Sequence, residues 1–445
     1  MAAAAGWSSR FGFLMASIGF AVGLGNIWRF PYVTGENGGS AFVLVYLACA
    51  FLIGVPILMA EVMLGRSGRA TPPTSLMKLS GQAGSSTGWR HVGHLNLLTS
   101  FAILVSYSVV AGWVLLYLWK ALTTGFDGID AQRSAAVFDT MLTNVGQLTH
   151  WMFMALVVAC AIIWAGVQKG IERAVVVLMP LLFLLLVGLA LFNVFAGGMT
   201  ETLSYLFYPD FSKLTGATFL AALGQAFFSI GVAMAGMMMF GAYLPDNVSI
   251  ARSALIIVVA DTGVALLAGL VIFPMVFANQ LDPAGGAGLI FQTLPVAFGQ
   301  MPFGGVVAIC FFLLLSVAAV TSVVGLCEPL AAWLMERFHF GRPAASVVLF
   351  VLLAIFSLVS VLSYNHWADV SLGSMSLSGW IDFVPNQVLL PLGGLLIAVF
   401  AGWVIKPDVA QQALGLSNGA FRLWYNLLRY LVVLAVAVIF VNGLR

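Results

Sequence analysis

Eleven stretches of roughly 20 mostly apolar residues recur along the chain, and each is long enough to cross a bilayer as a helix. They lie near residues 11–33, 40–65, 92–121, 149–167, 172–195, 217–241, 253–279, 303–335, 344–363, 381–404 and 423–443. Only 8% of the residues are charged, whereas a soluble domain carries about 25%. We therefore predict an all-α membrane protein with about eleven transmembrane helices in one polytopic domain, residues 1–445.

Charge and cysteine content narrow the possible partners. The formal net charge of +2 gives no basic surplus for neutralising a nucleic-acid backbone. All four cysteines fall within apolar stretches, where thiols act as small packing residues, so neither a disulfide nor a metal framework is indicated. The expected partners are the lipid bilayer and a small-molecule substrate, with no nucleic acid and no obligate protein partner evident.

The basic residues predict the orientation, because the cytoplasmic side of a membrane protein collects Lys and Arg. With the N-terminus inside, thirteen of them fall at cytoplasmic ends and loops: Arg10, Arg66, Arg69, Lys78, Arg90, Lys169, Arg173, Arg252, Arg337, Arg342, Lys406, Arg422 and Arg429. The outside receives four, Lys120, Arg133, Lys213 and Arg445, and Arg29 lies within a span. We expect a multi-pass protein of the inner (plasma) membrane with a cytoplasmic N-terminus and an external C-terminus.

The first and sixth spans carry small residues in mid-span, GFAVGLGN at Gly19 to Asn26 and SIGVAMAG at Ser229 to Gly236. Each cluster alone is also compatible with close helix packing. Matched clusters five spans apart favour a 5+5 inverted repeat with broken helices one and six, whose site lies at the membrane midplane. The first repeat would cover about 11–195, the second about 217–404, and residues 423–443 would form an extra helix.

Several motifs resemble those of the neurotransmitter:sodium symporter family, and in particular its bacterial amino-acid transporter branch. The most specific is AVGLGNIWRFPY at Ala21 to Tyr32, followed by ENGGSAF at Glu36 to Phe42. Further matches are EVMLGR (61–66), GIERA (170–174), GQAFFS (224–229), VTS (320–322) and LLPLGG (389–394). The resemblance covers nearly the whole chain and implies a sodium-coupled symporter that works by alternating access.

The physical chemistry of a broken helix agrees with such a site. An unwound segment presents free amide groups at a positive dipole end and free carbonyls at a negative end, which suits a zwitterion. Its carboxylate can face the amides near Leu24 and Gly25, and its ammonium the carbonyls near Ala21 and Phe228. Hard cations prefer oxygen ligands, which the same breaks expose.

Position by position, the resemblance implies two sodium sites. The first would comprise Ala21, Asn26, Ser229 and Asp261, completed by the substrate carboxylate. The second would lie between the carbonyls of Gly19, Val22 and Ala318 and the hydroxyls of Thr321 and Ser322. Taken alone, Thr321 and Ser322 are more often helix residues that bond back to their own carbonyls.

The resemblance also implies gates and a substrate pocket. Tyr107 would meet the substrate carboxylate, Phe228 would close over the site, and Arg29 with Asp382 would form the outer gate, although a structural ion pair is the alternative. The implied substrate-binding residues are Phe20, Ala21, Gly23, Leu24, Gly25, Ile103, Tyr107, Phe228, Ser229, Gly231, Met234, Ser322 and Leu326.

The chemistry of these positions predicts the substrate class. Gly23 offers no side chain where the monoamine branch has an aspartate, so the substrate should bring its own carboxylate. The pocket offers no charged group to pair with a charged side chain of the substrate, which favours a neutral, hydrophobic amino acid. Gly231 leaves volume for an aromatic ring. A transport-incompetent amino-acid sensor or a channel-like pore on the same fold is the alternative, and an enzyme is not indicated.

Asp261 bears on the ions that accompany transport. We expect sodium ions, bound at two sites, and no chloride requirement, because Asp261 supplies a negative charge beside the first sodium site while Ala265 lacks the hydroxyl that an anion site would use. A protonated, hydrogen-bonded Asp261 is the alternative, since burial favours the neutral carboxyl.

Overall fold

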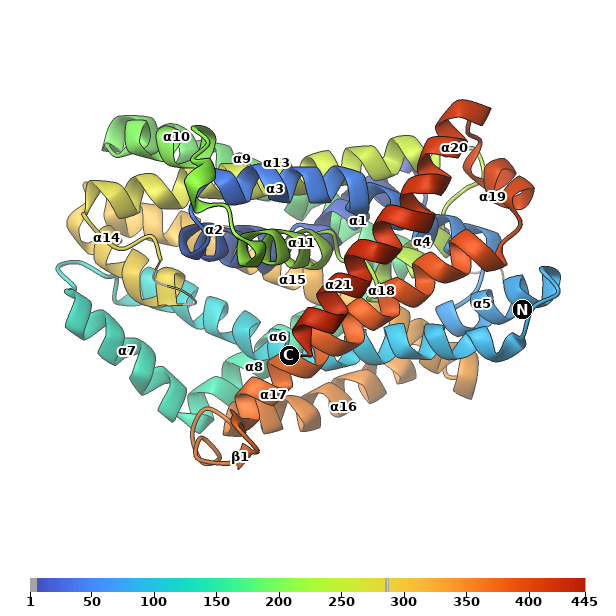
Figure 1. Cartoon of the computed structure of the whole chain (residues 1–445). Helices are drawn as coiled ribbons and strands as arrows, with labels where there is room; N and C mark the ends of the chain where they lie inside the picture. The colour runs from blue at the N-terminus through green and yellow to red at the C-terminus, as the bar shows by residue number, and fades with distance from the viewer. Residues whose placement is uncertain (1–5, 285, 287, 445) are drawn as a thin grey trace.

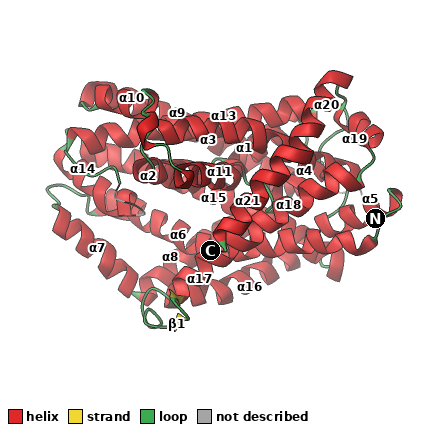
Figure 2. Ribbon diagram, viewed as in Figure 1, coloured by secondary structure: helices red, strands yellow, loops and turns green. Residues whose placement is uncertain are grey.

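The computed structural model describes residues 6–284, 286 and 288–444, and these residues are almost wholly helical (Figure 1, Figure 2). Within them, nine helices are long and apolar enough to cross a membrane, and one bent helix pair adds a tenth. The only strands in the described part are β1 (Ser371–Leu372) and β2 (Met375–Ser376), which pair antiparallel in a short hairpin. The predicted all-α membrane class is confirmed.

The long helices follow the predicted spans closely, and several include short π-helical segments; the label η marks these segments and also two short 3-10 helices, η3 and η5. They are α3 (Ser40–Cys49), η2 (Ala50–Gly54) and α4 (Val55–Gly68); α6 (Arg90–Thr123); α8 (Val145–Trp164); η4 (Val167–Glu172) and α9 (Arg173–Ala196); α13 (Ile250–Ala278); α15 (Gly304–Phe338); α16 (Arg342–Leu362); α17 (Leu377–Phe383), η7 (Val384–Leu389), α18 (Leu390–Val399) and η8 (Phe400–Val404); and α20 (Asn418–Asn426), η9 (Leu427–Val432) and α21 (Val433–Gly443). Shorter helices connect them: α5 (Pro72–Gln82), η3 (Thr87–Trp89), α7 (Ala131–Thr143), α10 (Met199–Phe207), η5 (Phe211–Lys213), η6 (Leu289–Thr293), α14 (Leu294–Gln300) and α19 (Pro407–Leu414).

The first span is broken where the sequence predicts. Helix α1 (Arg10–Ala21) ends at the glycine-rich run, and the chain resumes as η1 (Gly25–Arg29) and α2 (Phe30–Glu36). The two halves meet at an angle of 46°. Val22 and Gly23 therefore form a short non-helical segment between the two helix ends, and Leu24 is the N-cap of the second half.

The sixth span is broken as well, between α11 (Gly216–Ile230) and α12 (Gly236–Ala242). Gly231, Ala233 and Ala235 have positive φ angles of 74°, 63° and 61°, a region that costs an L-residue other than glycine about 1–2 kcal/mol. Side chains of other helices hold this strained segment. The backbone N–H of Ala233 donates to Glu61 Oε1 at 2.5 Å, and the Ser100 hydroxyl donates to the Met234 carbonyl.

The broken helices lie near the middle of the bundle, beside α15, whereas α21 runs along its outside (Figure 1). The apolar window of α15 is 72% buried, against 28% for the η4–α9 span. The site is thus surrounded by protein, which is the condition under which irregular backbone is tolerated at membrane depth.

Arg445, predicted to lie outside the membrane, is beyond the described residues. The division into two repeats and the orientation in the membrane stay predictions.

The strain in the sixth span generates a test. We expect Ala235→Gly to stabilise the protein by about 0.5–1 kcal/mol, because glycine adopts this conformation without a Cβ penalty. Ala221→Gly, in the regular helix α11, should destabilise it by about 1 kcal/mol. Thermal unfolding of both variants in detergent measures the difference, and two variants that shift the midpoint equally would contradict the strain.

Candidate functional site

A cavity of about 530 Å³ leads from the ends of α7 and α17 down to the break in the first span. Leu24, Gly25, Ile103, Tyr107 and Phe228 line its floor. A smaller cavity of about 30 Å³ continues beneath it, and the last four of these residues line both. The two form one path from the surface of the bundle to the helix break.

The small cavity collects most of the predicted substrate-binding residues. Eleven of the thirteen line it: Phe20, Ala21, Gly23, Gly25, Ile103, Tyr107, Phe228, Gly231, Met234, Ser322 and Leu326. Leu24 lines the larger cavity instead. Ser229 lines neither, because its hydroxyl is turned to Asp261. Residues from four different spans thus converge on one small space.

The break presents a backbone amide to a tyrosine hydroxyl. The N–H of Leu24 donates to Tyr107 Oη at 3.1 Å. Gly23 lies between two hydroxyls, since a Cβ added there would fall 2.3 Å from Ser322 Oγ and 2.8 Å from Tyr107 Oη. A side chain at position 23 would therefore clash with these hydroxyls. The Leu24 amide and the two hydroxyls could donate to a carboxylate, whereas the Gly23 amide already donates to Asn26 Oδ1 at 3.0 Å.

Behind this segment lies a buried polar cluster of Asn26, Ser229 and Asp261, each at most 2% exposed. Asn26 Nδ2 donates to Ser229 Oγ at 2.9 Å, to Asp261 Oδ1 at 2.7 Å and to the Asp261 carbonyl at 3.0 Å. The Ser229 hydroxyl reaches both carboxylate oxygens, at 3.0 and 2.9 Å. Oxygens from two helices converge here on one donor, and such oxygens could hold a cation in its place.

The residues of the second predicted sodium site lie close together, but their hydroxyls donate hydrogen bonds to backbone carbonyls. A Cβ at Gly19 would lie 3.4 Å from Thr321 Cβ, so the first span packs directly on α15 here. The Thr321 hydroxyl donates to the carbonyls of Val317 and Ala318 in its own helix, and Ser322 Oγ donates to the Phe20 carbonyl at 3.4 Å. Val22 and Ala318 are fully buried.

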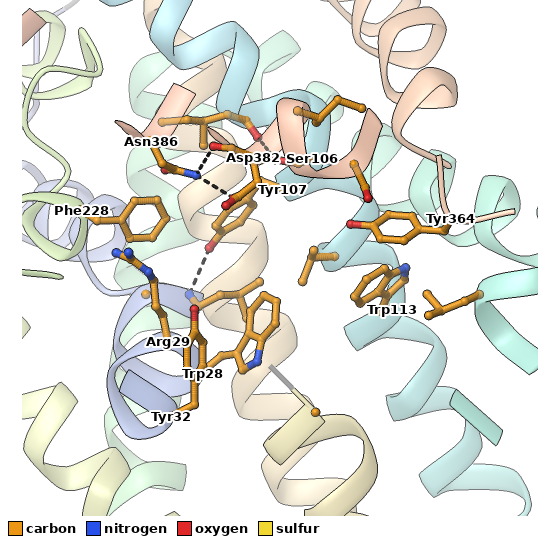
Figure 3. A pocket seen from close by; sticks show the side chains of 18 of the residues that line it. Trp28, Arg29, Tyr32, Ser106, Tyr107, Trp113, Phe228, Tyr364, Asp382 and Asn386 are labelled. Atoms are coloured by element: carbon orange, nitrogen blue, oxygen red, sulfur yellow. Dashed lines mark hydrogen bonds between the residues drawn. The ribbon is translucent and has the colours of Figure 1, made fainter. Parts of the chain in front are cut away.

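The four predicted gate residues all line the large cavity (Figure 3). Among the described residues, the ion pairs within 4.0 Å do not include Arg29 with Asp382. The Arg29 guanidinium lies 4.8 Å from the centre of the Phe228 ring, and Asp382 accepts a hydrogen bond from Asn386 at 2.8 Å. The two charged residues are thus on the walls of an open cavity.

The volume expected at Gly231 is already filled. A Cβ added at Gly231 would lie 2.9 Å from Phe20 Cε1, and Cβ atoms at Gly236 and Gly325 would lie 2.6 and 2.3 Å from the same ring. The three glycines enclose Phe20, and the centre of its ring lies 5.8 Å from the centre of the Phe240 ring. The expectation that Gly231 leaves room for a substrate ring is therefore corrected: Phe20 occupies that space.

At the N-terminal end of the bundle the path is closed, by residues to which the sequence reasoning gave no role. Trp7 is 4% exposed and donates to the Phe240 carbonyl. Glu172 accepts hydrogen bonds from Ser8 N, Ser8 Oγ and Ser9 Oγ at 2.9, 2.5 and 3.2 Å. Glu172 lies in the GIERA motif quoted above, and that motif was the sequence signal that could have identified it.

A second buried acid supports the same end. Glu328 is fully buried and forms a bidentate pair with Arg342 at 2.8 and 2.9 Å. Tyr243 donates to the same carboxylate at 2.7 Å. The pair ties the start of α16 to α15, so one end of the bundle is closed by polar contacts while the other contains the cavity.

Comparisons with known proteins agree with this arrangement. The model of the sodium:neurotransmitter symporter family matches residues 5–128 and 131–373. The sodium-dependent transporter YhdH of Bacillus subtilis is 36% identical over 98% of this chain and 97% of its own length, and a sodium-dependent transporter of Haemophilus influenzae is 32% identical over 98% of both chains. The crystal structure of MhsT in complex with L-phenylalanine matches with a TM-score of 0.91 and 38% identity, over 98% of this chain and 99% of that one.

The chain belongs to the sodium:neurotransmitter symporter family. The resemblance inferred from the motifs is confirmed. It is a multi-pass membrane protein of a transporter family rather than an enzyme.

The tight surroundings of Gly23 generate a test. Gly23→Ala should lower substrate affinity about 5- to 150-fold, because the added methyl would lie only 2.3 Å from Ser322 Oγ and 2.8 Å from Tyr107 Oη, and such clashes cost about 1–3 kcal/mol. Gly188→Ala, where no atom lies within 4 Å of the added Cβ, is the matched control. Equilibrium binding in detergent measures both, and an unchanged Gly23→Ala affinity would show that this segment does not line the site.

Proposed function

We propose that the protein is a sodium-coupled symporter that imports a neutral, hydrophobic amino acid by alternating access. The observation that carries the proposal is the adjacency of two features at one helix break. A backbone amide at Leu24 bonds to Tyr107 Oη, and two residues further on Asn26 bonds to Ser229 and Asp261. One end of the break suits a carboxylate and the other a cation.

The substrate class rests on position 23. Because Gly23 leaves no room for a side chain, the protein cannot supply an acid there to hold an amine, and the substrate itself must bring the carboxylate. The apolar residues of the small cavity, Phe20, Ile103, Met234 and Leu326 among them, offer no partner for a charged side chain. MhsT was crystallised with L-phenylalanine, which supports an amino acid of this hydrophobic class.

Sodium would be carried at two positions. The first is the cluster of Asn26, Ser229 and Asp261 with the Ala21 carbonyl, which the substrate carboxylate would complete. The second lies between Gly19, Val22 and α15, where Thr321 and Ser322 would exchange their present carbonyl partners for the ion. Oxygen ligands without thiols or imidazoles suit a hard cation.

The asymmetry of the bundle supports alternating access. The cavity is open at the end that carries Arg29 and Asp382, while Trp7, Glu172 and Glu328 close the other end. With the N-terminus in the cytoplasm, this arrangement corresponds to an outward-facing state. Approach of Arg29 to Asp382 over the Phe228 ring would then close the outer path.

Uptake into vesicles tests the proposal. We expect a labelled hydrophobic amino acid to accumulate when an inward sodium gradient is imposed and not with potassium, and unlabelled hydrophobic amino acids to compete better than charged ones. Binding without accumulation would identify a sensor, and sodium-independent equilibration would identify a pore. Either outcome would contradict the symporter.

Chloride independence is part of the same proposal. Tyr46 Oη lies 3.4 Å from Asp261 Oδ2, and Gln225 donates to the Gly25 carbonyl at 2.7 Å, so two groups of the kind an anion site would use face the break. Ala265, one turn after Asp261, is fully buried and offers no hydroxyl. A carboxylate and a chloride so close would repel in a low-dielectric interior, so Asp261 would take the anion's place.

Replacing chloride by gluconate tests this role. Uptake by the parent should not change. Asp261→Asn should lower the affinity for sodium about tenfold, because a buried charge partner of the cation is lost. Thr262→Ser, next along α13, is the control. Parent uptake that collapses in gluconate, or an Asn variant with undiminished sodium affinity, would contradict the proposal.

A further inference from the structure

Arg429 lies on the outer side of the bundle among three aromatic rings. Its guanidinium carbon is 4.9 Å from the centre of the Trp403 ring, 5.5 Å from Tyr425 and 5.9 Å from Tyr430. Trp403 and Tyr430 also contact each other edge to face at 6.5 Å. The rings come from η8 on one span and from α20 and η9 on the next, so the arginine lies in the seam between two helices.

The charge of Arg429 has little compensation from the protein. Among the described residues, no carboxylate lies within 4.0 Å of it. Within the described part of the chain, its Nε is buried without a hydrogen-bond partner, while Nη1 donates to Tyr425 Oη at 3.5 Å. Cation–π contacts lower the cost of the charge, but they leave the buried Nε–H donor without an acceptor among the described residues.

The neighbouring span shows the level of this arginine in the bundle. Gly402 packs against Arg429, since a Cβ added at Gly402 would lie 3.6 Å from the arginine Cα. The span that contains Gly402 ends at Val404. Arg429 is therefore level with the end of a neighbouring apolar helix, the level at which a membrane interface is expected. Trp403 and Tyr430 are 42% and 62% exposed, as expected of aromatic residues at a membrane interface.

More positive charge and apolar surface flank the same seam. Arg422 precedes Arg429 by two helical turns, Lys406 follows the end of η8, and both are exposed, as is Asp408 in α19. On the outer face of α20 and α21, Leu423 and Leu434 are 63% and 65% exposed. Figure 1 shows α20 and α21 along the outside of the bundle beside α18.

We propose that Arg429, Trp403, Tyr425 and Tyr430 bind the phosphate of an anionic membrane phospholipid. The guanidinium donates to the phosphate oxygens, a pairing that its planar fork favours, while the exposed leucines contact the acyl chains. Charge complementarity selects the phosphate, and the apolar surface continuous with it selects a lipid over a free anion. The bound lipid fastens α18 to α21.

The test uses the whole protein in bilayer discs of phosphatidylcholine with increasing phosphatidylglycerol. Retained lipids are counted by native mass spectrometry, and the unfolding midpoint is measured in parallel. In the parent we expect bound phosphatidylglycerol and a rising midpoint. Arg429→Gln should weaken the apparent lipid affinity more than tenfold, because it removes charge-assisted hydrogen bonds to the phosphate.

Controls separate this site from other charges. Arg337→Gln removes another arginine that lies over an aromatic ring, Phe338 at 5.8 Å, and should leave the lipid affinity unchanged. Glycerophosphoglycerol and inorganic phosphate, which lack acyl chains, should not raise the midpoint. Equal lipid affinity in Arg429→Gln and the parent would overturn the proposal, and stabilisation by inorganic phosphate alone would overturn the lipid as its ligand.

If Arg429→Gln does not fold, Trp403→Leu and Tyr430→Leu remove the aromatic walls and keep the charge. A fall in lipid affinity in these variants would support the site. Undiminished affinity in both would overturn it.

Discussion

The structure depends on one constraint: backbone N–H and C=O groups within a membrane need hydrogen-bond partners. Two helices of this protein are interrupted at mid-span, so some of their backbone groups lack the usual partners within the helix. The exposed groups are satisfied by side chains of neighbouring helices. Tyr107 accepts from Leu24 N–H, Gln225 donates to the Gly25 carbonyl, and Glu61 accepts from Ala233 N–H. Unsatisfied groups of this kind cost several kcal/mol each in hydrocarbon, so the surrounding helices are fixed in place by the breaks they support.

The same breaks place groups suited to a cation close to groups suited to a carboxylate. Asn26 belongs to the first broken helix and Ser229 to the other, and both bond to Asp261 of α13. A cation at this cluster would draw the two broken helices onto α13, and a carboxylate at the Leu24 end would contribute a further oxygen. Binding of each would then favour binding of the other, which is the thermodynamic requirement for coupled transport.

The sequence was sufficient for the span positions and for both breaks, because apolar length and paired glycine runs are local signals. It also identified the residues that line the small cavity, through motifs that span nearly the whole chain. It could not show that Phe20 fills the space at Gly231, since that depends on how three helices approach one ring. Nor could it assign Glu172 to Ser8 and Ser9, a contact between residues more than 160 positions apart. Nor could it show that Arg29 and Asp382 do not pair among the described residues, since that depends on how their two helices approach each other.

The central claim, that the substrate carboxylate completes the first sodium site, is tested most directly by sodium binding with two ligands that differ only in that group. Sodium affinity would be measured alone, with a hydrophobic amino acid, and with the amine that remains after its decarboxylation. The account predicts that the amino acid raises sodium affinity by about 5- to 150-fold, the usual range of coupling between sites, and that the amine does not. Equal enhancement by both ligands would contradict it.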